Sequence, residues 1–97
     1  MNAHTAKLNA LIDDFVAGKS EFFSFWNDFM RVWNDEIPPD GLSAAERGLY
    51  EEAYELVYMG APEPVAAADQ TAGVIGAKVL RSRLQRFRGQ VAARLPA

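Results

Sequence analysis

The chain has 97 residues, 49% of them hydrophobic, and carries a formal net charge of −3. This length suits one domain with one core, and the hydrophobic content argues against intrinsic disorder. With no cysteine in the sequence, disulfides and thiolate metal sites are excluded. We therefore expect a single domain over residues 1–97 that is stabilised by packing alone.

The expected location follows from hydropathy. Residues 1–19 contain no basic stretch followed by an apolar run, which a signal peptide would have. No apolar run approaches the roughly 20 residues needed to cross a bilayer. We expect a cytoplasmic protein without a membrane partner.

Charge is distributed unevenly along the chain. Residues 1–70 hold all 13 acidic residues and four basic ones, a balance of −9, whereas residues 71–97 hold six basic residues and no acid. This asymmetry indicates either a charged partner or pairing of a basic helix with its acidic neighbours.

Hydrophobic residues at helical spacing predict a first helix over about residues 5–17, ended by Gly18. A second helix is predicted over residues 20–36, with Ser20 as its cap. The apolar stripe of this helix is formed by Phe22, Phe25, Trp26, Phe29 and Trp33, widened by Phe23 and Met30. We interpret it as core rather than a base-stacking platform, because only Arg31 supplies an interleaved cation.

The third helix is predicted over about residues 43–59. Ser43 with Glu46 three residues later forms a capping-box pattern at its start. Gly60 and the following Pro62 end it.

A fourth helix is predicted over about residues 71–95, although Gly73, Gly76 and Gly89 weaken it. No strand pattern is expected. Four amphipathic helices joined by short loops predict an all-α fold, an antiparallel four-helix bundle.

The sequence shows no catalytic or metal-binding constellation. His4 is the sole histidine, and there is no phosphate-binding glycine loop. Adjacent carboxylates on a helix diverge by about 100° and do not share a proton. We expect no enzymatic activity, no cofactor and no metal.

The outward face of the third helix predicts a partner-binding site. At about 100° per residue, one side of the helix points inward and carries Leu49, Ala53, Leu56, Val57 and Gly60. The candidate binding residues on the opposite face and in the following loop are Glu51, Glu52, Glu55, Tyr58, Met59 and Glu63. An exposed aromatic among like charges is typical of a recognition surface. The alternative is an ordinary solvated face, in which Arg47 pairs with Glu51 at i,i+4.

These features resemble the small immunity proteins of the colicin D type, which neutralise a tRNA-cleaving bacteriocin. The similarity covers about residues 8–88, whereas residues 90–97 have no counterpart. The shared positions are Leu42-Ser43, Glu51-Glu52, Pro62-Glu63, Arg81-Ser82, Leu84 and Phe87, with a looser match at Phe15 and Gly18-Lys19.

The resemblance implies an antiparallel four-helix bundle that binds the toxin's nuclease domain and blocks its basic active site with acidic side chains. These side chains imitate the phosphates of the RNA. It also implies that Glu63 is a contact residue. Tyr58 stands at a family contact position that is acidic in one member, and Glu55 one turn earlier would compensate.

Two other classes of function stay open. One is a non-enzymatic helical adaptor or a homodimeric regulatory protein that pairs through the Tyr58–Met59 face or the last helix. The other is a nucleic-acid binder that uses the arginines of the last helix, but the isoelectric point of about 5.0 disfavours it. We expect those arginines to form salt bridges to acids on neighbouring helices.

Overall fold

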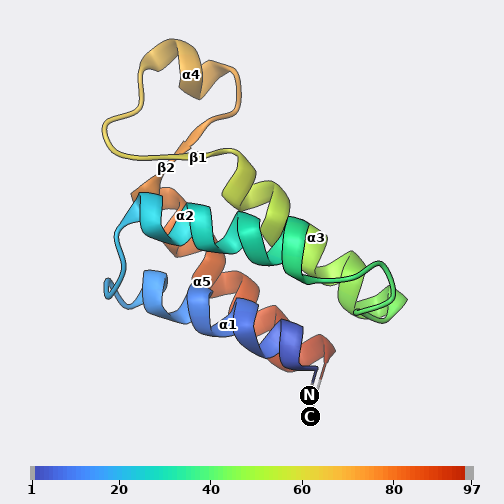
Figure 1. Ribbon diagram of the computed structural model, residues 1–97. Helices are drawn as coiled ribbons and strands as arrows, with labels where there is room; N and C mark the ends of the chain where they lie inside the picture. Colours follow the sequence, from blue (N-terminus) through green and yellow to red (C-terminus); the bar gives the residue numbers. More distant parts are fainter. Residues whose placement is uncertain (1, 96–97) are drawn as a thin grey trace.

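The computed structural model describes residues 2–95 (Figure 1). The helices are α1 (Ala3–Val16), α2 (Phe22–Arg31), α3 (Ala44–Tyr58), α4 (Ala67–Thr71) and α5 (Ala77–Arg94). A π-helical turn, η1 (Val32–Glu36), continues α2, and two short strands, β1 (Gly60–Ala61) and β2 (Ile75–Gly76), pair in parallel. The chain is mostly helical, as predicted.

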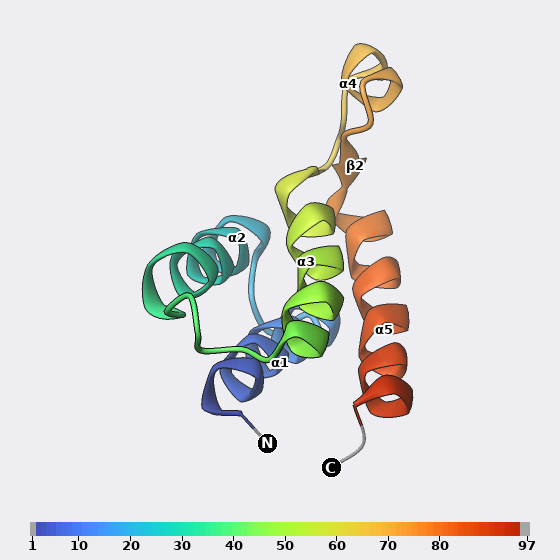
Figure 2. The same cartoon turned by 90° about the vertical axis from the view of Figure 1, so that its right-hand side faces the viewer.

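Four of the helices pack around a common core. Helix α1 contacts α2 and α5, and α3 contacts the same two helices. Figure 2 shows α3 and α5 side by side along most of their length. Within residues 2–95 no helix is long and apolar enough to cross a membrane.

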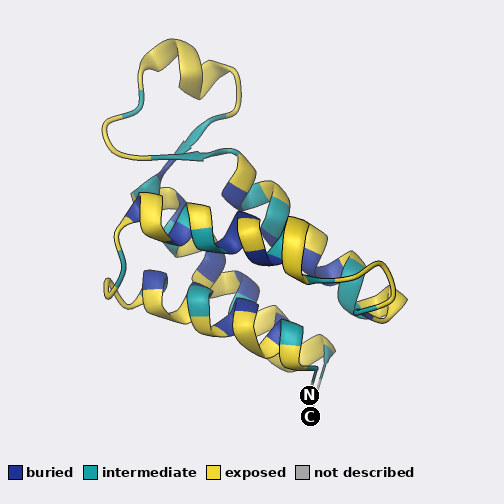
Figure 3. Ribbon diagram, in the orientation of Figure 1, coloured by how far each residue is buried: buried dark blue, intermediate teal, exposed yellow. Residues whose placement is uncertain are grey.

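The buried residues, dark blue in Figure 3, lie mainly on the sides of these helices that face the core. Phe15 of α1 stacks on Phe25 of α2 with ring centroids 4.4 Å apart. The buried Tyr50 hydroxyl donates a hydrogen bond of 2.6 Å to Asn9 Oδ1. One predicted member of the stripe is wrong: Phe23 is 57% exposed, because it lies about 100° around the helix from the buried Phe22.

The predicted end of the first helix is confirmed. Gly18 has a φ of +78°, Lys19 N–H donates to Asp14 O at 2.8 Å, and Gly18 N–H donates to Phe15 O at 3.1 Å. These two bonds satisfy the last carbonyls of α1 in the Schellman arrangement. The helix begins two residues earlier than predicted because Asn2 caps it and accepts from His4 N–H.

Of the N-caps predicted for α2 and α3, one is confirmed and the other is wrong. The predicted capping box of α3 is confirmed: Ser43 Oγ accepts from Glu46 N–H, and Glu46 Oε1 accepts from Ser43 N–H. The predicted cap of the second helix is wrong, because α2 begins at Phe22 after an extended Glu21. The Ser20 hydroxyl is buried and has no hydrogen-bond partner within residues 2–95.

The predicted fourth helix begins later than expected. Helix α5 starts at Ala77, and residues 61–76 instead form an arm that projects from the helices, carries α4 and returns through β2 (Figure 1). Gly73, with a φ of +98°, ends α4. Ile75 then pairs with Gly60 across the two strands, a partner 15 residues earlier that local periodicity does not reveal. The expectation of no strand is corrected by this two-residue ladder.

Candidate partner-binding surface

Helix α3 presents the predicted face to solvent. Leu49, Ala53 and Val57 are buried against the core, so the opposite side of the helix points outward. Its residues are Glu51, Glu52, Glu55 and Tyr58, which are exposed, and Met59, which is half-buried. We call these five residues the α3 face. The structure therefore brings together five of the six predicted binding residues.

The three carboxylates of the α3 face have different surroundings. Glu52 Oε2 lies 3.2 Å from Arg94 Nη1, with both side chains about half exposed, and such surface ion pairs contribute only about 0–1 kcal/mol. Neither Glu51 nor Glu55 has a hydrogen-bond or ion-pair partner among the residues that the structure describes. Two carboxylates at i,i+4 thus remain unneutralised.

Arg47 does not soften this repulsion. Its guanidinium donates to the carbonyl oxygens of Pro38 and Pro39, at 3.4 and 3.1 Å, and lies over the Trp33 ring at 5.9 Å. The proposed i,i+4 pairing with Glu51 is therefore wrong in this structure. Arg47 binds the loop rather than Glu51 because its guanidinium contacts two carbonyl acceptors and the Trp33 ring there at once.

Aromatic side chains form a row beside these carboxylates. Trp33 of η1 stacks on Tyr54 with centroids 5.6 Å apart and an interplanar angle of 21°. Tyr54 in turn lies 6.1 Å from Tyr58 at 33°. Tyr54 is half-buried, whereas Tyr58 is 61% exposed. The row therefore emerges from the edge of the core and ends at the surface.

Three hollows adjoin one another across α3. The tyrosine hollow, of about 330 Å³, is lined by Tyr54, Glu55, Tyr58 and Met59. The phenylalanine hollow, of about 320 Å³, is lined by Phe22, Phe23, Trp26, Asn27, Tyr58, Gly60, Ala61 and Pro62. The mixed-charge hollow, of about 350 Å³, is lined by Glu52, Glu55, Leu56, Met59, Gly73, Ile75 and Arg83. The tyrosine hollow shares Tyr58 with the phenylalanine hollow and shares Glu55 and Met59 with the mixed-charge hollow, so the three form one continuous uneven surface.

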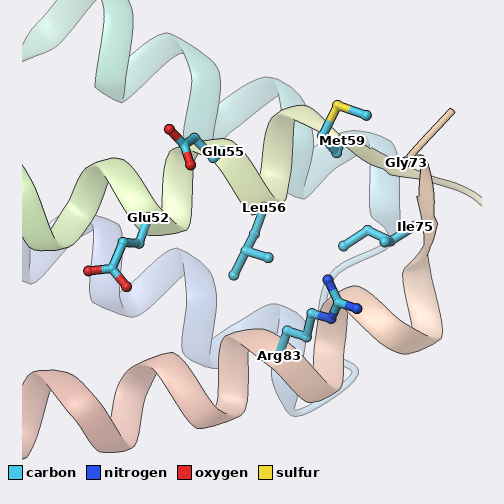
Figure 4. A pocket seen from close by; sticks show the side chains of 7 residues that line it. All are labelled: Glu52, Glu55, Leu56, Met59, Gly73, Ile75 and Arg83. Carbon is cyan, nitrogen blue, oxygen red and sulfur yellow. The ribbon is translucent and has the colours of Figure 1, made fainter.

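The mixed-charge hollow lies between α3 and α5 (Figure 4). Glu52 and Glu55 project from α3, Arg83 projects from α5, and Leu56 lies between the two sides. Arg83 forms no ion pair with any residue in the range 2–95. Glu55 is therefore not neutralised from this side either.

Glu63 lies outside the α3 face and has a structural contact. Its Oε1 accepts a hydrogen bond of 3.1 Å from the backbone N–H of Lys78, in the first turn of α5. Gly76, the N-cap residue of α5, has no side chain that could do this, so Glu63 caps the helix from the arm. A Cβ at Gly76 would collide with the Glu63 carboxylate. The signal in the sequence that we missed is a glycine at the N-cap, Gly76, together with an acidic residue, Glu63, on the preceding arm.

The basic residues of α5 are partly engaged in contacts with other helices. Arg88 Nε donates to Asp13 Oδ1 at 2.7 Å, and this hydrogen bond to the carboxylate raises the pKa of Arg88. Arg81 donates to Phe15 O at 2.9 Å and lies 4.6 Å over the Phe15 ring. Together with Arg94, these residues fasten α5 to α1 and α3, whereas Arg83 and Arg86 have no salt bridge within the described chain.

Among residues 2–95, no group of three or more His, Cys, Asp or Glu residues is arranged to hold a metal ion. In comparisons with known proteins, no family model, no curated protein and no solved structure matches the chain. The α3 face is therefore the feature of this chain from which a function can be inferred.

Proposed function

We propose that this chain is an immunity protein whose four long helices form an antiparallel bundle. Its α3 face binds the nuclease domain of a cognate bacterial toxin, a colicin D-like tRNase, in the cytoplasm. Binding covers the basic active site and inhibits the toxin without any chemistry of its own. The observation that carries the proposal is the pair Glu51 and Glu55, both without a partner in residues 2–95, beside the 61% exposed Tyr58.

Electrostatics supports a cationic partner. Like charges at i,i+4 destabilise a helix by about 0.2–0.5 kcal/mol, and a positively charged surface docked on Glu51 and Glu55 removes that repulsion. An active site that binds RNA phosphates is positively charged. Opposite fields also accelerate association. The exposed ring of Tyr58 supplies the kind of aromatic anchor that dominates many interfaces.

The test reverses the charge of the two free carboxylates. The toxin is sought in the gene next to the one that encodes this chain, and its nuclease domain is co-expressed with the Glu51→Lys/Glu55→Lys variant. Like-charge contacts at an interface cost several kcal/mol, so we expect at least about a hundredfold loss of affinity. Loss of cell survival and renewed tRNA cleavage should accompany it.

The matched control is Asp14→Lys/Asp40→Lys, which changes the net charge equally. Both aspartates are exposed, lie in α1 and in the loop before α3, and form no side-chain hydrogen bond or ion pair within the described residues. Protection should persist in this control. Full protection by the Glu51/Glu55 variant would overturn the proposal.

A homodimeric or adaptor function is the second candidate, favoured by one observation. Phe23 and Tyr58 are 57% and 61% exposed and line the same phenylalanine hollow. A second copy of the chain would cover this apolar area. Light scattering at micromolar concentration tests the homodimer: a stable dimer that buries Tyr58 supports the second candidate and contradicts the first, and a monomer contradicts the homodimeric function.

A further inference from the structure

The aromatic row on α3 has a different environment at each end. At the inner end, the Arg47 guanidinium lies over Trp33 at 5.9 Å from the ring centroid. The row then continues through Tyr54 to Tyr58. At the outer end, Tyr58 is 61% exposed. An arginine of the chain itself thus covers one end of the row, while the other end is open.

The open end combines aromatic surface with one carboxylate. The tyrosine hollow, about 330 Å³ in volume, is lined by Tyr54, Glu55, Tyr58 and Met59, so one acidic residue borders a mainly apolar surface. Glu55 has no ionic partner in residues 2–95. Arg83 is the basic residue lining the adjoining hollow, and Figure 4 shows it on the α5 side, with Leu56 between it and Glu55.

This combination selects a particular chemical group. A guanidinium is planar, stacks on aromatic rings and donates two parallel hydrogen bonds to a carboxylate. A lysine ammonium is a strongly hydrated point charge that cannot stack. A phosphate or carboxylate ligand would be repelled by Glu51 and Glu55 together.

We propose that the tyrosine hollow receives an arginine side chain of the protein partner, with its guanidinium stacked on Tyr58 and hydrogen-bonded to Glu55. The inference rests on the proposed function for the identity of the partner, the toxin's nuclease domain. Beyond that function, the inference specifies that the partner is held through one of its arginine side chains. The chemistry of the hollow is testable with this chain alone.

The first experiment titrates the isolated chain with N-acetyl-arginine amide while NMR follows the rings of Tyr54 and Tyr58 and the Glu55 side chain. The lysine and citrulline amides are the reference probes, since citrulline keeps the plane but has no charge. We expect the arginine probe to shift these signals at concentrations at least about threefold below the lysine probe. Equal responses to all three probes would overturn the proposal.

Variants then locate the probe. Tyr58→Phe keeps the ring and should keep binding, whereas Tyr58→Ala and Glu55→Gln should each weaken it about tenfold. Phe23→Ala is the matched control, because Phe23 is a similarly exposed aromatic that does not line the tyrosine hollow. If Phe23→Ala weakens binding as much as Tyr58→Ala does, the probe is held by exposed aromatic surface in general and the proposal is wrong.

The cognate nuclease separates this inference from the proposed function. If Tyr58→Ala inhibits the nuclease as tightly as the parent chain, the arginine contact is wrong although the immunity function stands. If the hollow selects arginine but no nuclease is inhibited, the hollow is confirmed and the immunity function fails. If sedimentation instead shows a dimer that Tyr58→Ala dissociates, a second copy occupies the hollow and the inference about the partner is overturned.

Discussion

Removal of the Glu63 carboxylate should destabilise the start of α5. The first N–H groups of a helix have no intrahelical acceptor, and the N-cap residue Gly76 has no side chain to supply one. Glu63 Oε1 accepts from Lys78 N–H at 3.1 Å. Loss of a capping side chain costs about 1 kcal/mol. For a chain of this size, Glu63→Ala should therefore lower the melting temperature by about 4–8 °C.

Gly76 provides a way to isolate the contact. A Cβ at this position would lie 2.7 Å from Glu63 Cδ, so Gly76→Ala must displace the carboxylate. The intrinsic effect of alanine at an N-cap is the same with or without Glu63 and cancels in a double-mutant cycle. We expect Gly76→Ala to be more destabilising in the parent chain than in Glu63→Ala, by about 1 kcal/mol.

Urea unfolding at neutral pH, followed by far-UV circular dichroism, measures all four members of the cycle. Glu51→Ala is the control, since Glu51 is exposed without a partner in residues 2–95, and it should change stability by less than about 0.5 kcal/mol. A coupling energy below about 0.3 kcal/mol lies within the error of additivity. That result would refute the assignment of Glu63 as the cap of α5.

Two further predictions concern stability. Gly18→Ala should lower the free energy of unfolding by about 1–2 kcal/mol, because φ there is +78°. Gly89→Ala within α5 should raise it by as much as about 1 kcal/mol. A Cβ meets nothing within 4 Å at either site, so equal unfolding curves for the two variants would contradict these predictions. Tyr50→Phe should cost about 1–3 kcal/mol, because it leaves the 6% exposed Asn9 without its donor. Burial raises the pKa of Tyr50, so its contribution to stability is complete below the ordinary tyrosine pKa of about 10 and is lost as pH rises through the folded value. Above pH 10, the Tyr50→Phe variant should therefore lose less folding stability than the parent chain does. An alkaline unfolding transition that is the same in both would show that another group is responsible.

Local pattern predicted the parts of the fold that local forces determine. The capping box at Ser43, the glycine end of α1 and the inward stripe of α3 depend on residues within one or two turns of each other. The exposure of Tyr58 follows from the same 100° rotation. Sequence reasoning therefore placed the α3 face correctly.

Contacts between distant residues account for what was missed. The pairing of Gly60 with Ile75 shortens the predicted last helix. Glu63 is held by Lys78, which lies 15 residues later, and Glu52 is paired with Arg94, which lies 42 residues later. None of these contacts leaves a periodic signal, so the sequence presented Glu52 and Glu63 as equivalent to Glu51 and Glu55.

This difference changes how the proposed complex would be held together. With Glu63 capping α5 and Glu52 beside Arg94, Glu51 and Glu55 carry the free negative charge of the predicted site within residues 2–95. Exposed charges at the rim of an interface act mainly on the association rate and its salt dependence. The lifetime of a complex depends more on well-packed aromatic anchors. On the proposed function, Glu51 and Glu55 therefore both guide the toxin to α3, and the surface around Tyr58, together with the Glu55 carboxylate beside it, retains the toxin.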